Sequence, residues 1–286
     1  MQKFWSGLVR MAAICLACLV WGSHVLAATP LRVVAPAPPS LTNLNLEVKA
    51  LETIYALDLT PQQLKVLEQL AAGAADQRDR QPGQGPAVLS PALVKLGEAI
   101  MRGAADDQIE TLQDDADEYR DGDDVDLDDA VALTATARKR APDVLKLLTA
   151  SQVAAYISGC ADDISGPLEE MLDSLDELRT ADSDDFVELR DQVADDVALA
   201  LAGLDVEKDT KISAQITAWL NKVRALGPTD FKMRSAQLQQ EAKALVGEVD
   251  PLQVVRNYLL RDMAEMLSNP QLPSAIAGRL KFARAE

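Results

Sequence analysis

Histidine is almost missing from this sequence of 286 residues. The one histidine, His24, stands among the first 28 residues, which we interpret below as an export signal. The exported chain is therefore expected to contain no histidine. Because a Ser-His-Asp triad, a Cys-His pair and His-ligated zinc, copper or haem sites all need an imidazole, these classes of site are excluded.

Cysteine is scarce as well. Cys15 and Cys18 stand in the same N-terminal stretch, which leaves Cys160 as the single cysteine of the exported chain. One cysteine cannot form a disulfide within its own chain, so packing must hold the fold together. We interpret Cys160 as a small buried residue, as free cysteines often are, with pairing between two chains as the alternative.

Positive charge is in short supply. Lys and Arg together number 28 against 45 Asp and Glu, and the formal net charge is −17. Proteins that bind nucleic acid need clustered Lys and Arg to contact the phosphates, so nucleic acid is not an expected partner. An anionic membrane surface is disfavoured for the same reason.

Long apolar runs are also lacking. One apolar stretch, from Met11 to Trp21, follows Lys3 and Arg10, and small residues near Ala27 offer a cleavage site. This pattern is typical of a secretory signal peptide, and the stretch is too short for a stable membrane span. We predict a signal peptide over residues 1–28 and a location in the periplasm or outside the cell, with no stable membrane insertion after cleavage. An uncleaved amphipathic anchor is the alternative.

The rest of the chain has the pattern of an all-α protein. Residues 29–43 carry four prolines, which predicts a short, extended linker. From Leu44 onward apolar residues recur at helical spacing, aromatic residues make up only 4% of the sequence, and no alternating strand pattern is visible. We predict a multi-helix bundle with a first helical domain over residues 44–160 and a second helical region over residues 161–286.

Several helix boundaries follow from local signals. Ser90 before Pro91 predicts a helix with Ser90 as its N-cap. Another helix is expected to run from about Asp126 to Arg140, and Trp219 is expected to be a core residue on its own helix. Four leucines at helical spacing predict a single further helix: Leu168, Leu172, Leu175 and Leu178.

A short motif, Leu-Thr-x-x-Gln, occurs twice. In each copy the Thr hydroxyl can accept a hydrogen bond from the backbone N–H of the Gln, and the Gln side chain can reach back to the Thr N–H, which makes a capping box. The apolar residues that flank the motif can form a hydrophobic staple. Each motif position therefore has a role in starting a helix: Leu59, Thr60 and Gln63 in the first copy, and Leu148, Thr149 and Gln152 in the second.

Paired Leu-Thr-x-x-Gln motifs in an exported helical chain resemble the LTxxQ family of Spy/CpxP-like periplasmic chaperones and stress-response proteins. The resemblance covers about residues 44–160. It implies a curved helical cradle, often dimeric, followed here by a C-terminal helical extension. It also implies that the chain binds client proteins without ATP or restrains an envelope stress sensor. The implied partners are client proteins or a second copy of the chain.

The stretch from Asp117 to Asp129 is rich in aspartate and places Gly122 at the sixth position of an EF-hand loop. Tyr119 stands at the third position, where a calcium loop needs an oxygen ligand. We therefore interpret the stretch as a solvated turn in which Asp126 caps the next helix. Weak binding of divalent ions by the acidic segments is left open, and the sequence otherwise points to no metal site and no cofactor.

Acidic residues are too numerous for the sequence to single out a pair of catalytic carboxylates such as glycosidases use. The basic run from Arg138 to Arg140 is interpreted as a solvated helix face. We predict a non-catalytic exported helical protein of the cell envelope, chaperone-like or stress-related, rather than an enzyme. Two alternatives stay open: a structural or scaffolding helical protein without client binding, and a hydrolase that uses unrecognised carboxylates.

Overall fold

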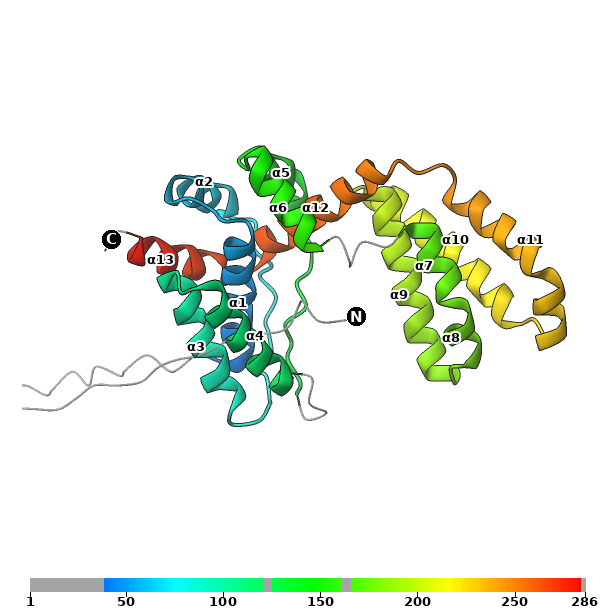
Figure 1. Cartoon of the computed structure of the whole chain (residues 1–286), viewed down its shortest axis with the longest axis horizontal. Coiled ribbons are helices and arrows are strands. Elements are labelled where there is room, and N and C mark those ends of the chain that lie inside the picture. Colours follow the sequence, from blue (N-terminus) through cyan, green and yellow to red (C-terminus); the bar gives the residue numbers. More distant parts are fainter. Residues whose placement is uncertain (1–38, 121–124, 161–165, 284–286) are drawn as a thin grey trace, which may run out of the picture. The chain divides into compact units, whose positions relative to one another are not determined.

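The computed structural model (Figure 1) describes residues 39–120, 125–160 and 166–283, apart from the side chains at positions 159, 160 and 184. The predicted signal peptide and the side chain of Cys160 lie outside this description. The described chain is all-α, as the sequence predicted, with helices α1 to α13 and one isolated antiparallel bridge between Gln84 and Asp126. None of the described helices combines the length and the apolar character that crossing a bilayer requires.

The chain forms two compact units that are interleaved in the sequence. The first comprises Met1–Glu68, Asp76–Val131 and Asn269–Glu286, and the second comprises Gln69–Ala75 and Ala132–Ser268. The predicted division at residue 160 does not coincide with a boundary of either unit. As a consequence, the two Leu-Thr-x-x-Gln motifs lie in different units, the first copy in the first unit and the second copy in the second.

Helix α1 lies at the centre of the first unit (Figure 1). It packs against α3 and α13, and α3 also packs against α4. The apolar residues that recur along α1 at helical spacing are buried: Leu44, Val48, Leu51 and Ile54. The bounds of these helices are Leu41–Ala56 for α1, Leu89–Arg102 for α3, Asp106–Arg120 for α4 and Leu272–Phe282 for α13, while α2, Pro61–Ala71, follows α1 in the chain. The largest fully buried side chains of the core are aliphatic: Leu46, Leu51, Ile54, Leu57, Leu64, Leu67, Leu89, Leu93, Leu96, Ile100 and Ile109.

A guanidinium group holds the end of α3. Arg279 on α13 donates through Nη1 to the carbonyl of Ile100 at 2.8 Å and to that of Met101 at 3.1 Å. The last carbonyls of a helix have no partner within the helix, so Arg279 supplies donors that α3 itself lacks. Gly103 then ends α3 in the left-handed region, with φ of 68°.

Helices α5 to α12 make up most of the second unit. α9 and α10 lie side by side, α7 and α8 pack against α9, and α12 packs against both α5 and α9 (Figure 1). The bounds are Ala135–Leu145 for α5, Ala150–Cys160 for α6, Pro167–Asp173 for α7, Leu175–Thr180 for α8, Ser183–Ala202 for α9, Val206–Arg224 for α10, Pro228–Val246 for α11 and Pro251–Ser268 for α12.

The core of the second unit runs from α7 through α11 and contains two buried aromatic residues, Phe186 and Trp219. The side chain of Trp219 is 6% exposed and packs with Ile216, Leu220 and Leu238, which confirms the predicted core position. Its indole N–H donates to Glu241 Oε2 at 3.3 Å. The polar end of the ring is therefore satisfied while the apolar body is buried.

The helix predicted from Asp126 is wrong. Asp126 exchanges two backbone hydrogen bonds with Gln84, at 2.8 and 3.0 Å, and these bonds keep its segment extended. The helix begins only at Ala135, where the hydroxyl of Thr134 accepts the N–H of Ala137 at 3.0 Å. Contacts with a distant segment thus outweigh the local capping preference of the aspartate.

Three smaller boundary predictions are also wrong. Helix α3 begins at Leu89 with Val88 as its N-cap and no capping side chain, so Ser90 lies inside the helix. The leucine stripe predicted as one helix is divided between α7 and α8 at Ser174. The predicted linker ends at Ser40, because Ser40 Oγ accepts the N–H of Asn43 at 3.2 Å and starts α1 there.

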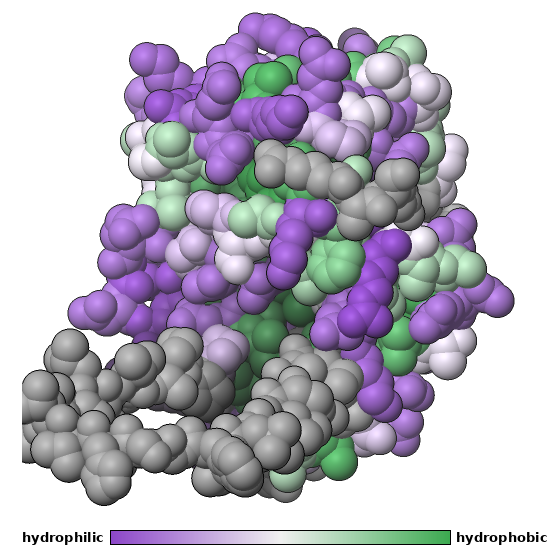
Figure 2. All heavy atoms as spheres, turned by 90° about the vertical axis from the view of Figure 1, so that its left-hand side faces the viewer, coloured by the Kyte–Doolittle hydropathy of each residue, from purple (hydrophilic) through white to green (hydrophobic). Residues whose placement is uncertain are grey.

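Hydrophilic residues dominate the face of the molecule shown in Figure 2, where hydrophobic residues appear between them as smaller areas. Charged residues make up 26% of the sequence, close to the usual share for a globular domain. A surface of this kind is typical of helices that bury one apolar stripe and expose the opposite side.

Arg224, the last residue of α10, holds the end of α8. Its Nη1 donates to the carbonyls of Leu178 and Arg179 at 2.8 and 2.6 Å, and its Nη2 donates to the carbonyl of Ala181 at 2.6 Å. The guanidinium also lies 5.0 Å from the ring centroid of Phe186. One side chain therefore supplies charged donors to three carbonyls at a helix C-terminus, where positive charge is favoured.

We expect Arg224→Met to lower the free energy of unfolding by about 2–3 kcal/mol, because the three carbonyls lose their charged donors. The matched control is Arg234→Met on α11, since the Arg234 Nε donates within its own helix, to Gln237 Oε1 at 3.3 Å. The control should change stability by less than about 0.5 kcal/mol. Urea unfolding followed by circular dichroism measures both, and equal losses for the two variants would contradict the prediction.

Candidate functional site

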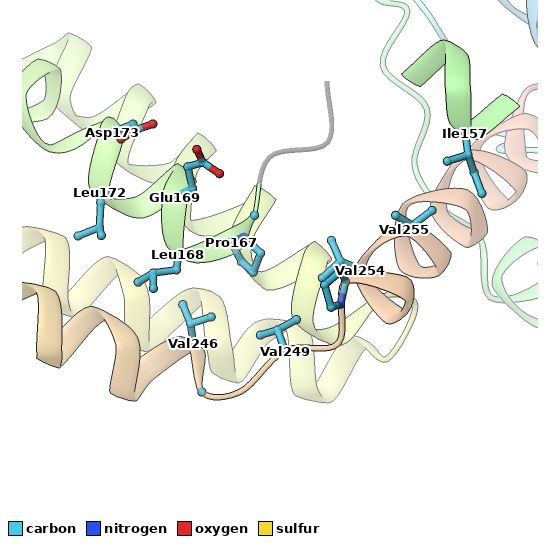
Figure 3. Close-up of a pocket in the computed structure, with 13 residues that line it drawn as sticks. Ile157, Pro167, Leu168, Glu169, Leu172, Asp173, Val246, Val249, Val254 and Val255 are labelled. Carbon is cyan, nitrogen blue, oxygen red and sulfur yellow. The ribbon is translucent and has the colours of Figure 1, made fainter. Parts of the chain in front are cut away.

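A groove lined mostly by apolar side chains lies on the second unit (Figure 3). Its volume is about 700 Å³, within the range found for ligand pockets. The end of α6, helix α7, the end of α11 with the link that follows it, and the start of α12 all contribute. The lining residues are Ile157, Gly166, Pro167, Leu168, Glu169, Leu172, Asp173, Val246, Gly247, Val249, Pro251, Val254 and Val255.

The local sequence creates this groove by ending one helix and starting another beside it. Gly247 has φ of 74°, a left-handed value that glycine adopts readily, and α11 ends before it at Val246. The chain then passes through Val249 and enters α12 at Pro251, a residue type that suits the first helical position. Figure 3 shows Val246 and Val249 below α7, and Val254 at the start of α12.

Glu169 and Asp173 are the only charged residues among those that line the groove. They stand four residues apart on α7 and so project from the same side of the helix. Both are exposed. In Figure 3 their carboxylates lie at the outer edge of α7, whereas Leu168 and Leu172 extend toward α11. The groove thus combines an apolar interior with an acidic rim.

The second unit also contains a smaller, polar cavity of about 320 Å³. Three helices contribute carboxylates to it. Arg261 donates through Nε to Glu265 Oε1 at 2.5 Å, and the hydroxyl of Tyr156 donates to Asp262 Oδ2 at 2.9 Å. The lining residues are Asp195, Asp196 and Leu199 of α9, Asp209 of α10, and Arg261, Asp262 and Glu265 of α12.

Burial raises the pKa values of carboxyl groups in this polar cavity. It raises the pKa of Asp262 to about 6, although the hydrogen bond from Tyr156 opposes the increase. The pKa values of Asp196 and Asp209 are also raised, first by burial and then by nearby carboxylates. Within the part of the chain that the structure describes, no group of three or more Asp, Glu or Cys residues is placed to hold a metal ion.

A fourth carboxyl with a raised pKa lies in the first unit. Glu52 on α1 is buried, and burial raises its pKa to about 8, while Arg120 is the largest influence in the opposite direction. Gln113 Nε2 donates to Glu52 Oε1 at 3.2 Å. Burial therefore favours the neutral form of Glu52, which lies between α1 and α4.

Both Leu-Thr-x-x-Gln motifs start helices through complete capping boxes. The N–H of Gln63 donates to Thr60 Oγ1 at 3.3 Å, and the N–H of Thr60 donates to Gln63 Oε1 at 2.9 Å. In the second copy the corresponding distances for Thr149 and Gln152 are 3.2 and 2.9 Å. No motif residue lines the apolar groove or the polar cavity, and any further role of the motif stays a prediction.

The aspartates of the predicted solvated turn make specific contacts with the first unit. Arg78 Nη2 lies 3.2 Å from Asp128 Oδ1, and Lys49 Nζ lies 2.6 Å from Asp129 Oδ2. These ion pairs place the C-terminal end of the stretch against α1 and against the segment after α2. Residues 121–124, in the middle of the stretch, lie outside the described residues.

The basic run from Arg138 to Arg140 is not wholly solvated, which corrects the prediction. Arg140 Nη1 donates to the carbonyls of Leu70 and Ala72 at 2.7 and 2.5 Å. Arg140 thus caps the C-terminal end of α2 in the same way that Arg279 caps α3.

Sequence reasoning missed the apolar groove, although one local pattern bears on it. Valines at positions 246, 249, 254 and 255 surround the helix break from Gly247 to Pro251. Apolar residues so close to a break cannot all face the core of the two helices that they join. The pattern indicates excess apolar surface, but it does not show that α6 and α7 lie beside it.

Comparison of the chain with protein-family models, curated proteins and solved structures found no significant match to any of them. The resemblance to the LTxxQ family therefore stays a prediction from the motif residues.

We expect Thr60→Ala and Thr149→Ala each to lower the free energy of unfolding by about 1 kcal/mol, because each removes the acceptor of a capping box. Thr60→Ser and Thr149→Ser keep the hydroxyl and serve as controls. Thermal unfolding measures the loss. A variant that loses a binding activity at unchanged melting temperature would show that capping is not the whole role of the motif.

The raised pKa of Asp262 predicts a pH dependence of stability. The folded state holds this proton up to about pH 6, whereas the unfolded state releases it near pH 4. The carboxyl therefore stabilises the folded state at low pH, and we expect roughly 3 kcal/mol of this contribution to be lost as the pH rises through that window. Asp262→Asn should remove this part of the pH dependence.

Asp176→Asn, at an exposed position of α8, is the control for the same change of charge. Unfolding free energies of the three proteins, measured by urea titration across the window, provide the comparison. Parallel curves for wild type and Asp262→Asn would contradict the prediction.

Proposed function

We propose that this protein is a non-catalytic binding protein that holds apolar segments of other polypeptides in the groove between α6, α7 and the α11–α12 link. The observation that carries the proposal is the composition of the groove. Its lining is apolar apart from Glu169 and Asp173, and it contains no Ser, Thr, Cys, His or Lys. Such a surface offers burial of apolar side chains rather than a nucleophile or a proton-transfer pair.

Burial of aliphatic side chains is sufficient to drive binding here. Each Val, Leu or Ile side chain that moves from water into an apolar site contributes about 1.5–3 kcal/mol. Two or three such side chains from a client would outweigh much of the cost of association and give a weak, reversible complex. Weak binding of exposed apolar segments is the activity that a chaperone-like protein needs.

The predicted place of action agrees with this role. We propose that residues 1–28 direct export and that the chain acts in the periplasm or outside the cell, as the resemblance to the LTxxQ family implies. The net charge of −17 favours solubility and disfavours nucleic acid. Clients, or a second copy of the chain, are the proposed partners.

The two alternatives make different demands on the structure. A scaffolding protein without clients would not need the apolar groove to be open. A hydrolase would use the polar cavity, because the raised pKa values of Asp196, Asp209 and Asp262 occur together there. The apolar groove, which is the larger of the two, favours binding as the function.

The test is suppression of aggregation of a chemically denatured client, followed by light scattering at stoichiometric amounts of the full chain. Val255→Asn adds a polar group to the groove without changing charge. It should weaken client binding about tenfold, because the polar amide would be desolvated on binding.

Val187→Asn, on α9 at a side chain that is 45% exposed, is the matched control and should behave like wild type. Circular dichroism verifies that both variants are folded. If wild type does not suppress aggregation, or if the two variants act alike, the groove is not a client site.

A further inference from the structure

The acidic rim of the groove has no basic counterpart in the described protein. The ion pairs between described residues involve neither Glu169 nor Asp173. Neither Lys nor Arg is among the residues that line the groove. Two like charges therefore stand four residues apart, exposed, beside an apolar surface.

This arrangement makes the choice of partner depend on charge. A partner that covers the apolar interior also removes water from the rim beside it. Partial desolvation of Glu169 and Asp173 is unfavourable unless the partner brings positive charge to them. An acidic partner would add repulsion, whereas Lys or Arg would form ion pairs with both carboxylates.

We propose that the groove takes a cationic amphipathic helix, whose apolar side chains enter the groove while flanking Lys or Arg side chains pair with Glu169 and Asp173. This inference rests on the proposed function, because it specifies the chemistry of the client for the same groove. Helices recognise such grooves through apolar residues at positions i, i+3 or i+4, and i+7.

A helix fits better than an extended strand. Binding by strand addition needs a sheet edge with free backbone N–H and C=O groups. The described residues contain no strand, and the groove is lined by helices and by the short link from Gly247 to Asp250, so it presents no sheet edge. Side-chain burial and charge are therefore the means of recognition that this surface offers.

Other occupants make different use of the rim. A small apolar molecule would not need the two carboxylates, and its affinity would not depend on them. An anionic membrane surface would be repelled by them and by the net charge of −17. The cationic helix is the occupant that both the apolar interior and the acidic rim favour.

The experiment measures fluorescence anisotropy of three labelled helical peptides titrated with the full chain. All three carry Leu at i, i+3, i+4 and i+7, and their remaining polar positions are Lys, Gln or Glu. We expect the Lys peptide to bind about tenfold more tightly than the Gln peptide, with the Glu peptide weakest. The difference should shrink at high salt, which screens exposed charges.

The double variant Glu169→Gln/Asp173→Asn tests the rim itself. It should remove the preference for the Lys peptide, so that the Lys and Gln peptides bind the variant with similar affinity. Glu110→Gln/Asp114→Asn on α4 is the matched control, because it neutralises the same two residue types at the same spacing and at exposed positions of the first unit. The control should keep the preference.

The outcomes separate this inference from the proposed function. Equal affinity for the three peptides, reduced by Val255→Asn, would overturn the inference and leave the groove as a client site. A Lys preference that survives in the double variant would also overturn it, because the charge of the whole chain would then be the cause. The inference would also be overturned if none of the three peptides binds, or if none of them displaces an apolar fluorescent dye that has first been bound in the groove. Absence of both peptide binding and aggregation suppression would overturn the inference and the proposed function together.

Discussion

An α-helix leaves the carbonyl groups of its last turn without partners, and a protein built almost wholly of helices must satisfy many such ends. Here guanidinium groups from distant parts of the sequence do so. Arg140 donates to the end of α2, Arg224 to the end of α8 and Arg279 to the end of α3. With few aromatic residues to interlock, leucine and alanine surfaces pack in several similar ways. A guanidinium group has N–H donors in a fixed planar geometry, and they can reach particular carbonyls in only one of these packing arrangements. The arginines therefore favour that arrangement.

The groove lies at a helix end of a different kind. Among the described residues, no guanidinium donates to the final carbonyls of α11. Gly247 turns the chain away instead, and α12 starts four residues later at Pro251. The short link keeps the valines on both sides of the break close together, beside α6 and α7. The polar cavity of the same unit is lined mainly by charged side chains. Carboxylates from α9, α10 and α12 converge there, and Arg261 is their single basic neighbour among the lining residues. The apolar groove and the polar cavity therefore differ in what they can bind.

The features that depend on neighbouring residues could be predicted from the sequence, and those that depend on distant ones could not. The helical class and the capping boxes at Thr60 and Thr149 are set by residues within one or two turns. The prediction that a helix begins at Asp126 was wrong because the backbone of Asp126 pairs with that of Gln84. The groove was missed because its walls come from α6, α7 and α12, whose meeting no local pattern encodes. Two helical regions were predicted, but their interleaving in the sequence was not, because α13 returns to the first unit after the whole of the second.

Because α13 is the last helix of the chain and belongs to the first unit, the core of the first unit can close only after the second unit has been synthesised. The first unit needs Leu272, Ala275, Ile276 and Leu280 of α13 to close its core, and these residues are synthesised after all of α5 to α12. The second unit is nearly continuous in sequence, so it can fold while the first unit still lacks a wall. Non-local closure of this kind is slow. Until it occurs, the newly made chain carries α1 and α3 with part of their apolar surface uncovered, and it passes through a stage in which it is itself a polypeptide at risk of aggregation.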